Sequence, residues 1–331
     1  MQANETYNQH YLSKVEQKLN ARNPNAAADN LRIYSFEVVD RENYLLSLEN
    51  PNGKTIWKNL SLFDLFSFDV LDGNGLRLNF ESLFQKYETS IEVHTKSLLA
   101  KLNRNDPDIK SEIIDLFAAK LLNFVRNPFS VAKVLNSFRG LANYDPTDPA
   151  LLADYRRIVT GKKPHQARLC AELGISETQY LTWLRLLFML LVPLVDGQPN
   201  IFEHLIKTLL ENRKTHVAAF VFEYDKERCL LSDRGFSQPI PDGPHMAFSF
   251  NLYATAFVNY IFADPSTLLS GQASPEFLAR ALAAREHSKA RFTSHSNAIT
   301  SACWRSTTGI PCINASGASI AQSNAGWCCK T

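Results

Sequence analysis

The sequence lacks the features that define several classes of protein. Its 331 residues carry a net charge of only +2, which excludes a histone-like polycation but not a local basic patch. Glycine (13) and proline (15) are too few for a collagen-like or low-complexity chain. Hydrophobic residues make up 45% of the chain, enough for a sizeable core, so wholesale disorder is also excluded.

No segment has the pattern of a secretory signal or of a membrane span. Residues 1–7 show no basic start followed by an apolar core. The apolar run at 180–195 is interrupted by Arg185 and is short for a span, and the run at 246–263 carries polar side chains. We therefore expect both runs to be buried, no membrane partner, and a cytoplasmic protein.

Standard catalytic motifs are missing too. The sequence contains no phosphate-binding Gly-Lys-Ser loop, no glycine-rich dinucleotide fingerprint, no His-Glu-x-x-His and no Gly-x-Ser-x-Gly. Any function must therefore be sought in individual polar residues.

Periodicity predicts strands toward both ends of the chain and helices between them. The fold class is α+β, with an N-terminal helix and β-hairpins, a central helical region, and C-terminal strands packed on the same core. Strands are predicted at 32–39, 43–48, 65–70, 76–79, 215–222, 229–231 and 246–251, with 229–231 as the return strand of 215–222. Helices are predicted at 5–22, 81–102, 111–125, 130–141, within 150–212, and at 265–287.

We expect a single large domain over residues 1–300, with a helical subdomain at about 111–212. The end of the chain differs in composition, because no acidic residue follows Glu286. Its cysteines do not have the spacing of paired zinc ligands. Residues 301–331 are expected to form a Cys- and Ser-rich, poorly ordered tail, which contains Cys303, Cys312, Cys328 and Cys329.

The segment 156–183 resembles a helix-turn-helix hairpin. Gly174 stands where the turn needs a positive φ, and Ser176 can cap the second helix. A run of cations without an acid precedes the turn and could contact phosphates, so nucleic acid is a candidate partner. These candidate nucleic-acid-binding residues are Arg156, Arg157, Lys162, Lys163 and Arg168.

An ordinary helical hairpin is the alternative for the same segment. The second helix begins with Glu177, which repels phosphate, and continues into an apolar run that must be buried. A helix that reads bases needs an exposed polar face instead.

Three carboxylates fall on one face of the predicted helix at 81–102. Glu81, Glu88 and Glu92 are spaced at i, i+7 and i+11, and clustered acids can bind Mg²⁺. Glu88 and Glu92 are therefore candidate metal ligands, with Mg²⁺ as the candidate cofactor. The alternative is a solvated helix face beside Lys86 and Lys96.

Other polar residues stand where chemistry could be built. Asn123 and Arg126 interrupt the apolar end of their helix, and a buried Arg needs a partner, so Arg126 is a candidate anion clamp. Ser232 and Asp233 follow an apolar strand, where they can line a site or simply form a tight turn. His10 lies on the first predicted helix, in a polar context.

Taken together, short motifs at these positions resemble an uncharacterised bacterial family, domain-of-unknown-function family 4238. The chain departs from the family pattern at Ser13-Lys14-Val15, where the family has Pro and an aromatic, and at Arg234-Gly235, where it has Asn-Pro. The resemblance covers roughly residues 8–300 and lies in 10–12, 32–36, the helix with the three carboxylates, 117–128, 231–233 and 246–250.

The resemblance implies no activity, but it groups His10, Arg126 and Asp233, which we expect to converge with Asn123 and Ser232 as catalytic residues. His as base, Asp as its partner or a metal ligand, and Arg as a phosphate clamp would suit phosphodiester hydrolysis. We therefore expect a hydrolase- or nuclease-like enzyme, with a role in defence against phage or mobile elements by analogy with the family's bacterial setting. The alternative is a non-catalytic nucleic-acid-binding or protein-interaction module.

Overall fold

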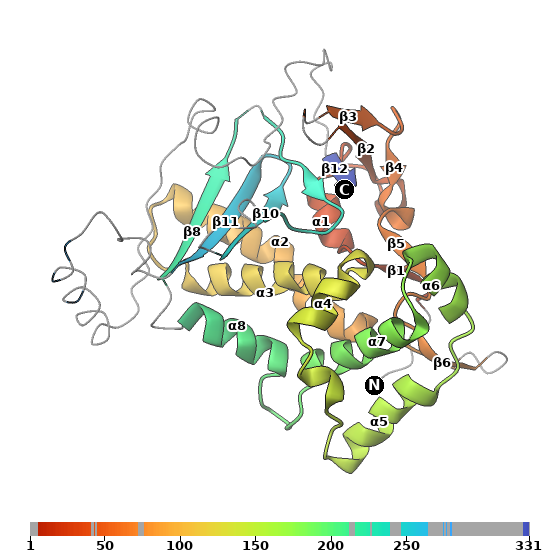
Figure 1. Cartoon of the computed structure of the whole chain (residues 1–331). Coiled ribbons are helices and arrows are strands. Elements are labelled where there is room, and N and C mark those ends of the chain that lie inside the picture. Colours follow the sequence, from red (N-terminus) through yellow and green to blue (C-terminus); the bar gives the residue numbers. More distant parts are fainter. Residues whose placement is uncertain are drawn as a thin grey trace.

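The described part of the chain has an α+β fold, as predicted from the sequence. In this computed structural model, N-terminal strands, a group of helices and a three-stranded sheet surround one main apolar core (Figure 1). The buried side chains of that core run from Tyr11 to Phe262, so the helices of 111–212 share it with the strands. The structure describes residues 6–40, 43, 45–71, 76–211, 216–225, 227–238, 246–263, 274, 276, 279 and 327–330.

The N-terminal segment corrects the predicted helix at 5–22. Strand β1 (Asn8–His10) pairs antiparallel with β5 (Ser61–Phe63), and helix α1 spans only Lys14–Leu19. The side chain of Ser13 caps α1 by accepting a hydrogen bond from the Val15 amide. Pairing with a distant strand has overridden the local helical preference of this polar segment.

Two predicted β-hairpins are confirmed. Strand β2 (Arg32–Asp40) pairs antiparallel with β3 (Leu45–Leu48), and β6 (Phe68–Leu71) pairs with β7 (Leu76–Leu78). The turn at 72–75 lies outside the described residues. Strand β4 (Lys54–Thr55) pairs with the start of β2, and the short 3₁₀ helices η1 (Ala28–Asn30) and η2 (Ile56–Lys58) complete this part.

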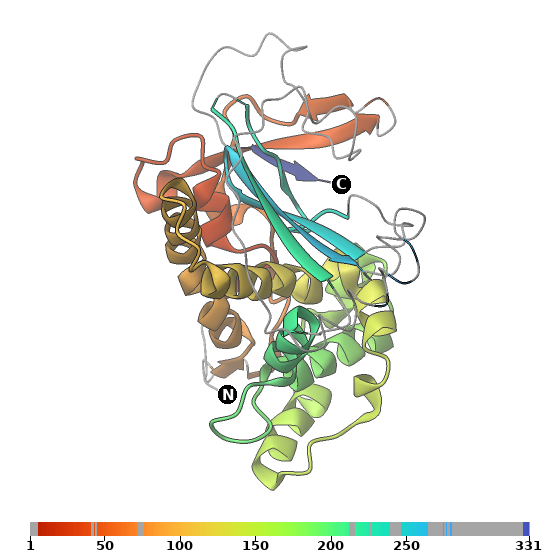
Figure 2. The ribbon, with the colours of Figure 1, turned by 90° about the vertical axis from the view of Figure 1, so that its left-hand side faces the viewer.

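Helices α2 (Glu81–Asn103) and α3 (Lys110–Arg126) agree with the predicted helices at 81–102 and 111–125. The apolar face of α3 packs against the C-terminal sheet, as Figure 2 shows. Phe117 is the centre of this contact, with its ring 4.8 Å from that of Tyr260 and 5.8 Å from that of Phe250.

The remaining helices follow as a group on one side of α3 (Figure 1). Helix α4 is shorter than the predicted 130–141, because the chain leaves it at Phe138 and forms a 3₁₀ turn. The bounds are η3 (Pro128–Ser130), α4 (Val131–Ser137), η4 (Leu141–Asn143), α5 (Pro149–Thr160), α6 (Gln166–Leu173), α7 (Glu177–Leu191) and α8 (Ile201–Glu211).

The C-terminal sheet has the strand order β10–β11–β8 and is antiparallel. Its strands are β8 (His216–Glu223), β10 (Met246–Tyr253) and β11 (Ala256–Ala263). The predicted return strand at 229–231 is therefore wrong, since β8 pairs with β11 instead. The chain at Cys229 runs alongside this sheet and donates its amide to the Ala254 carbonyl.

Four residues of the predicted tail belong to the described part of the chain, and its poor order stays a prediction. Strand β12 (Trp327–Lys330) lies parallel to β2 and to the two-residue strand β9 (Leu231–Ser232). The rest of the 301–331 tail lies outside the described residues, as does nearly all of the predicted helix at 265–287. In the described part of the chain, no helix combines the length and the apolar character needed to cross a bilayer.

Candidate functional site

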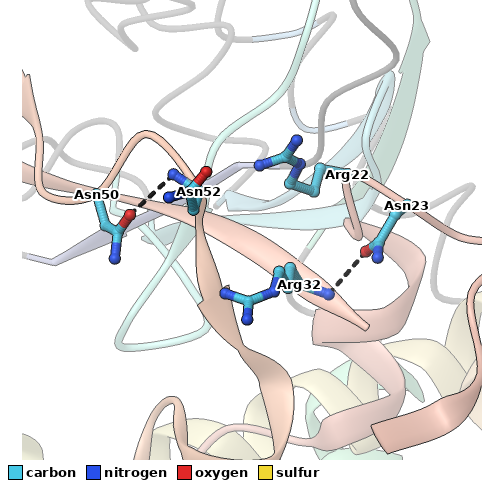
Figure 3. A pocket seen from close by; sticks show the side chains of 5 residues that line it. All are labelled: Arg22, Asn23, Arg32, Asn50 and Asn52. Carbon is cyan, nitrogen blue, oxygen red and sulfur yellow. Dashed lines mark hydrogen bonds between the residues drawn. The ribbon is translucent and has the colours of Figure 1, made fainter. Parts of the chain in front are cut away.

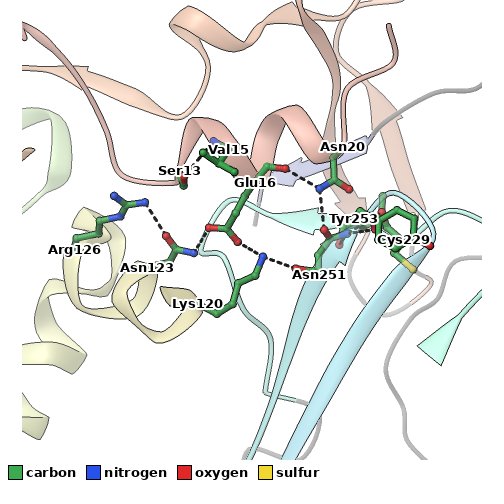
Figure 4. Close-up of polar contacts among 11 residues, drawn as sticks. Ser13, Val15, Glu16, Asn20, Lys120, Asn123, Arg126, Cys229, Asn251 and Tyr253 are labelled. Carbon is green, nitrogen blue, oxygen red and sulfur yellow. Dashed lines mark hydrogen bonds and ion pairs between the residues drawn. The ribbon is translucent and has the colours of Figure 1, made fainter. Parts of the chain in front are cut away.

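A buried ion pair joins α1 to α3 at the centre of the molecule (Figure 4). Lys120 is 0% exposed, and its Nζ lies 2.5 Å from Oε1 of the buried Glu16. The same ammonium donates to the Asn251 carbonyl of β10 at 2.6 Å. Asn123 Nδ2 donates to the other Glu16 oxygen at 2.6 Å. Both buried charges are therefore compensated.

Arg126 extends this chain of contacts from α3 to α2. Its guanidinium, 1% exposed, pairs with Glu88 through Nη1 and donates to Asn123 Oδ1 through Nη2 at 2.9 Å. The guanidinium also lies 5.2 Å from the centre of the Phe84 ring. Its Nε is buried and finds no hydrogen-bond partner within the described part of the chain.

Glu81 is the first residue of α2 and lies close to the same charges. Burial and, after it, the negative charge of Glu88 raise the pKa of Glu81 to about 7, against the opposing charges of Arg126 and Lys14. Its Oε1 is buried and has no hydrogen-bond partner among the residues that the structure describes. Near neutral pH this carboxyl group is therefore divided between its two protonation states, which is the condition for proton transfer.

His10 belongs to the same electrostatic neighbourhood, but its proton affinity is low. Burial lowers the pKa of His10 to about 4, and the charges of Lys14 and Arg126 add to that effect. Its Nε2 lies 3.1 Å from the Ile56 carbonyl oxygen, and this hydrogen bond opposes the effect of burial because it favours the protonated ring. The ring is neutral at pH 7, so it is a weak general base there.

We call these five residues the acid–base cluster: His10, Lys14, Glu81, Glu88 and Arg126. They come from β1, the start of α1, two turns of α2 and the end of α3. Lys14 and the two carboxylates interact across this space, because burial lowers the pKa of Lys14 while Glu81 and Glu88 oppose that shift.

The Ser232–Asp233 pair forms a tight turn against the end of α3. The Gly235 amide donates to the Ser232 carbonyl at 2.9 Å, and Gly235 has φ +76°. A Cβ at this glycine would lie 2.6 Å from the Cβ of Asn123, so only glycine permits the close approach. Ser232 and Asp233 therefore lie in a tight turn, one of the two alternatives that the sequence allows for them.

The turn also makes a direct contact with α3. Asn127 Nδ2, at the end of that helix, donates to the Asp233 carbonyl at 2.9 Å. The structure therefore brings Asn123, Arg126 and the Ser232–Asp233 turn to one end of α3, and it places His10 within electrostatic reach of Arg126.

The carboxylates predicted to bind Mg²⁺ have cationic partners instead. Glu88 pairs with Arg126, and Glu92 pairs with Lys96 at 2.5 Å on an exposed part of α2. Among the described residues, no group of three or more His, Cys, Asp or Glu side chains is arranged to hold a metal ion. Glu88 and Glu92 therefore have no third protein ligand in the described structure.

The hairpin at 156–183 has the predicted turn geometry. Gly174 has φ +65°, and Ser176 and Gln179 form a capping box at the start of α7. The rest of α7 is core, however, and Trp183 Nε1 donates to the Val125 carbonyl of α3 at 2.8 Å. The buried apolar face of α7 fits the ordinary helical hairpin, while Glu177 and Thr178 at its start are exposed. Nucleic-acid binding by this hairpin stays a prediction.

Three of the five predicted nucleic-acid-binding cations make contacts within the fold. Arg157 pairs with Asp69 at 3.0 Å, and Arg168 pairs with Glu172 at 2.9 Å. Lys163 Nζ donates to the Gly161 carbonyl at 2.8 Å, and burial lowers the pKa of this lysine. The other two, Arg156 and Lys162, have exposed side chains.

Sequence reasoning missed the Glu16–Lys120 pair and the proton affinity of Glu81. A signal for the pair is present, because Lys120 lies three residues from Phe117 and seven from Ile113, on the apolar stripe of its helix. A lysine in such a stripe needs a buried anion. Nothing local identifies Glu16 as that anion.

Comparisons with known proteins give no relative for this chain: no family model, no curated protein and no solved structure matches it. The resemblance to the domain-of-unknown-function family, and the role in phage defence that it suggests, therefore stay predictions.

Proposed function

We propose that the acid–base cluster is the active site of a hydrolase that cleaves phosphodiesters, with Glu81 as its proton-transfer residue. The observation that carries the proposal is the meeting of three ionisable groups, Lys14, Glu88 and Arg126, around the carboxyl group of Glu81. The pKa of that group is raised to about 7, and no described residue forms a hydrogen bond with one of its two oxygens. Perturbed carboxylates grouped with cations are typical of active sites.

The residues of the cluster divide into two roles. Lys14 is partly exposed, so its ammonium can reach a phosphate oxygen of a bound substrate. Arg126 is buried and held by Glu88 and Asn123, which makes it a positioning residue that sets the electrostatic environment of Glu81. His10 is neutral and bonded to backbone, so the base role that the sequence suggested for it passes to Glu81.

The reaction follows from these roles. Water adds to the phosphorus, and the water proton passes to the Glu81 carboxylate. The P–O bond to the leaving alcohol breaks, and Glu81 returns the proton to the alkoxide oxygen. The products are a phosphate monoester and an alcohol, and the carboxylate is restored. The charge of Lys14 offsets the negative charge that builds up on the phosphoryl oxygens.

Two exposed aromatic rings next to the cluster favour a nucleic-acid substrate. Trp57 is 52% exposed, and Lys14 Nζ lies 4.0 Å from the centre of its ring. Phe129 is 48% exposed and packs edge-on against Tyr11, the residue after His10. Rings exposed in this way can stack on unpaired bases, whichever base is present.

The test compares wild type with Glu81→Gln on single-stranded DNA, RNA and a chromogenic phosphodiester, each with and without Mg²⁺. We expect Glu81→Gln to lower kcat at least about 100-fold, the usual contribution of a general acid–base group, and the wild-type rate to depend on a group with a pKa near 7. Glu92→Gln is the matched control, because Glu92 lies exposed on the same helix.

Equal rates for wild type and Glu81→Gln would contradict the proposal. A loss of activity in His10→Gln without one in Glu81→Gln would return the proton-transfer role to the histidine. Near-ultraviolet circular dichroism on each variant separates a catalytic effect from loss of the fold.

A further inference from the structure

A second site lies on the β2 side of the molecule, in an open basin of about 470 Å³ (Figure 3). Its lining comes from three separate segments: the chain after α1, the start of β2, and the turn between β3 and β4. It shares no lining residue with the acid–base cluster. The lining residues are two arginines and three asparagines, namely Arg22, Arg32, Asn23, Asn50 and Asn52.

Both arginines are held in place by one turn. Arg22 Nη1 donates to the Pro51 carbonyl at 3.2 Å, and Arg32 Nη1 donates to the Gly53 carbonyl at 3.0 Å. Gly53 has φ +71°, and a Cβ there would lie 2.9 Å from the Ile33 carbonyl oxygen. The turn can therefore approach β2 this closely only with glycine at this position.

The asparagines fix the remaining walls of the basin. Asn23 Oδ1 accepts from the Arg32 amide at 2.7 Å, which joins the chain after α1 to β2. Asn50 Oδ1 accepts from the Asn52 amide at 2.8 Å. The lining is thus ordered before any ligand binds, which lowers the entropic cost of binding.

The charge of the basin is not compensated. Neither Arg22 nor Arg32 forms an ion pair with a carboxylate in the described part of the chain, in contrast to Arg126, Arg157 and Arg168. Among the described residues, no acidic side chain lines the basin. Arg22 also lies over the Tyr34 ring, 4.9 Å from its centre, which limits its freedom to turn away.

We propose that this basin binds the phosphate group of a nucleotide-sized ligand. Guanidinium groups present several donors in a planar fork that matches phosphate oxygens. The asparagine carboxamides both donate and accept, so they suit sugar hydroxyls or a base edge beside that phosphate. The volume lies in the range of small-molecule sites. The proposal does not depend on the hydrolase activity proposed above.

Isothermal titration calorimetry of the full chain with three probes tests the proposal: adenosine 5′-monophosphate, inorganic phosphate and adenosine. We expect the monophosphate to bind, and the double variant Arg22→Gln/Arg32→Gln to weaken that binding at least about tenfold. Arg139→Gln removes the same charge at an exposed position outside the basin and should bind like wild type. Arg32→Lys, which keeps the charge but loses the fork, should bind with intermediate affinity.

The outcomes separate the possible sources of the phosphate. Tighter binding of the monophosphate than of inorganic phosphate supports a nucleotide, while equal binding of the two supports a bare phosphate site and overturns the nucleotide-sized ligand. Adenosine binding as tightly as its monophosphate, no binding of either anion at millimolar concentration, or unchanged binding in a folded double variant would each overturn the proposal.

Discussion

Two cations of α3, Lys120 and Arg126, and the arginines of α5 and α6 have opposite environments. Lys120 and Arg126 are buried and held by carboxylates and amides from α1 and α2. On the other helices, Arg156 points into solvent, and the pair of Arg168 with Glu172 has both side chains 46% exposed. A buried charge must have its partner, whereas an exposed one is solvated by water.

The burial of a charged side chain, and not its residue type, therefore decides how much it contributes to the stability of this fold. Losing one partner of a buried pair leaves an uncompensated ion, while losing one partner of a surface pair returns the other to water. The three predictions below test that contrast, from the largest expected effect to the smallest.

Lys120→Met should lower the free energy of unfolding by about 3–5 kcal/mol, because it leaves the Glu16 carboxylate buried without its cation. The double variant Glu16→Gln/Lys120→Met should recover part of that loss, since a neutral amide can still accept from Asn123. Urea unfolding followed by circular dichroism measures both. A double variant that is as unstable as the sum of its single variants would contradict the pairing.

The pH dependence of stability should contain two opposing contributions from the acid–base cluster. The folded pKa of Glu81 is raised from 4.5 to about 7, so the folded state binds this proton more tightly and stability falls as pH rises through that window. The folded pKa of His10 is lowered from 6.5 to about 4, so stability falls as pH decreases through that range.

Two variants separate these contributions. As the pH rises from 4.5 to about 7, the free energy of unfolding of Glu81→Gln should increase by about 1–3 kcal/mol relative to that of wild type. The variant lacks the carboxyl group whose ionisation the folded state disfavours. As the pH falls toward 4, His10→Gln should gain stability relative to wild type, because it lacks the ring whose protonation the folded state disfavours. Unfolding free energies measured from pH 4 to 8 provide the test, and curves parallel to wild type would show that the two groups do not titrate as described.

Arg168→Gln should change the free energy of unfolding by no more than about 0.5 kcal/mol, because its ion pair with Glu172 is exposed and screened by salt. Arg156→Gln, which removes an exposed cation of the same run, is the control. Thermal unfolding at low and high salt measures both variants. A loss as large as that of Lys120→Met would place Arg168 among the structural charges.

Much of the fold is predictable from short stretches of sequence. The apolar stripes of α2 and α3 and the strand pairs of the β2–β3 and β6–β7 hairpins follow local patterns. Ser176 caps α7 and Gly174 adopts positive φ, because capping and left-handed backbone depend on one or two residues. The polar residues Asn123 and Arg126 interrupt the apolar stripe of α3, so their position at the end of this helix was also predictable from the sequence.

Features that depend on distant residues were decided only by the tertiary structure. Strand β1 forms because Asn8–His10 meets Ser61–Phe63, and β8 takes β11 as its partner rather than the nearer segment at 229–231. Lys120 and Glu16 are 104 residues apart in the chain. The raised pKa of Glu81 likewise comes from burial and from charges on other segments. Sequence alone determined helices α2 and α3 and the β2–β3 and β6–β7 hairpins, because backbone preferences act between neighbours. Only folding decided which charges are buried together, because burial is a property of the whole packed core.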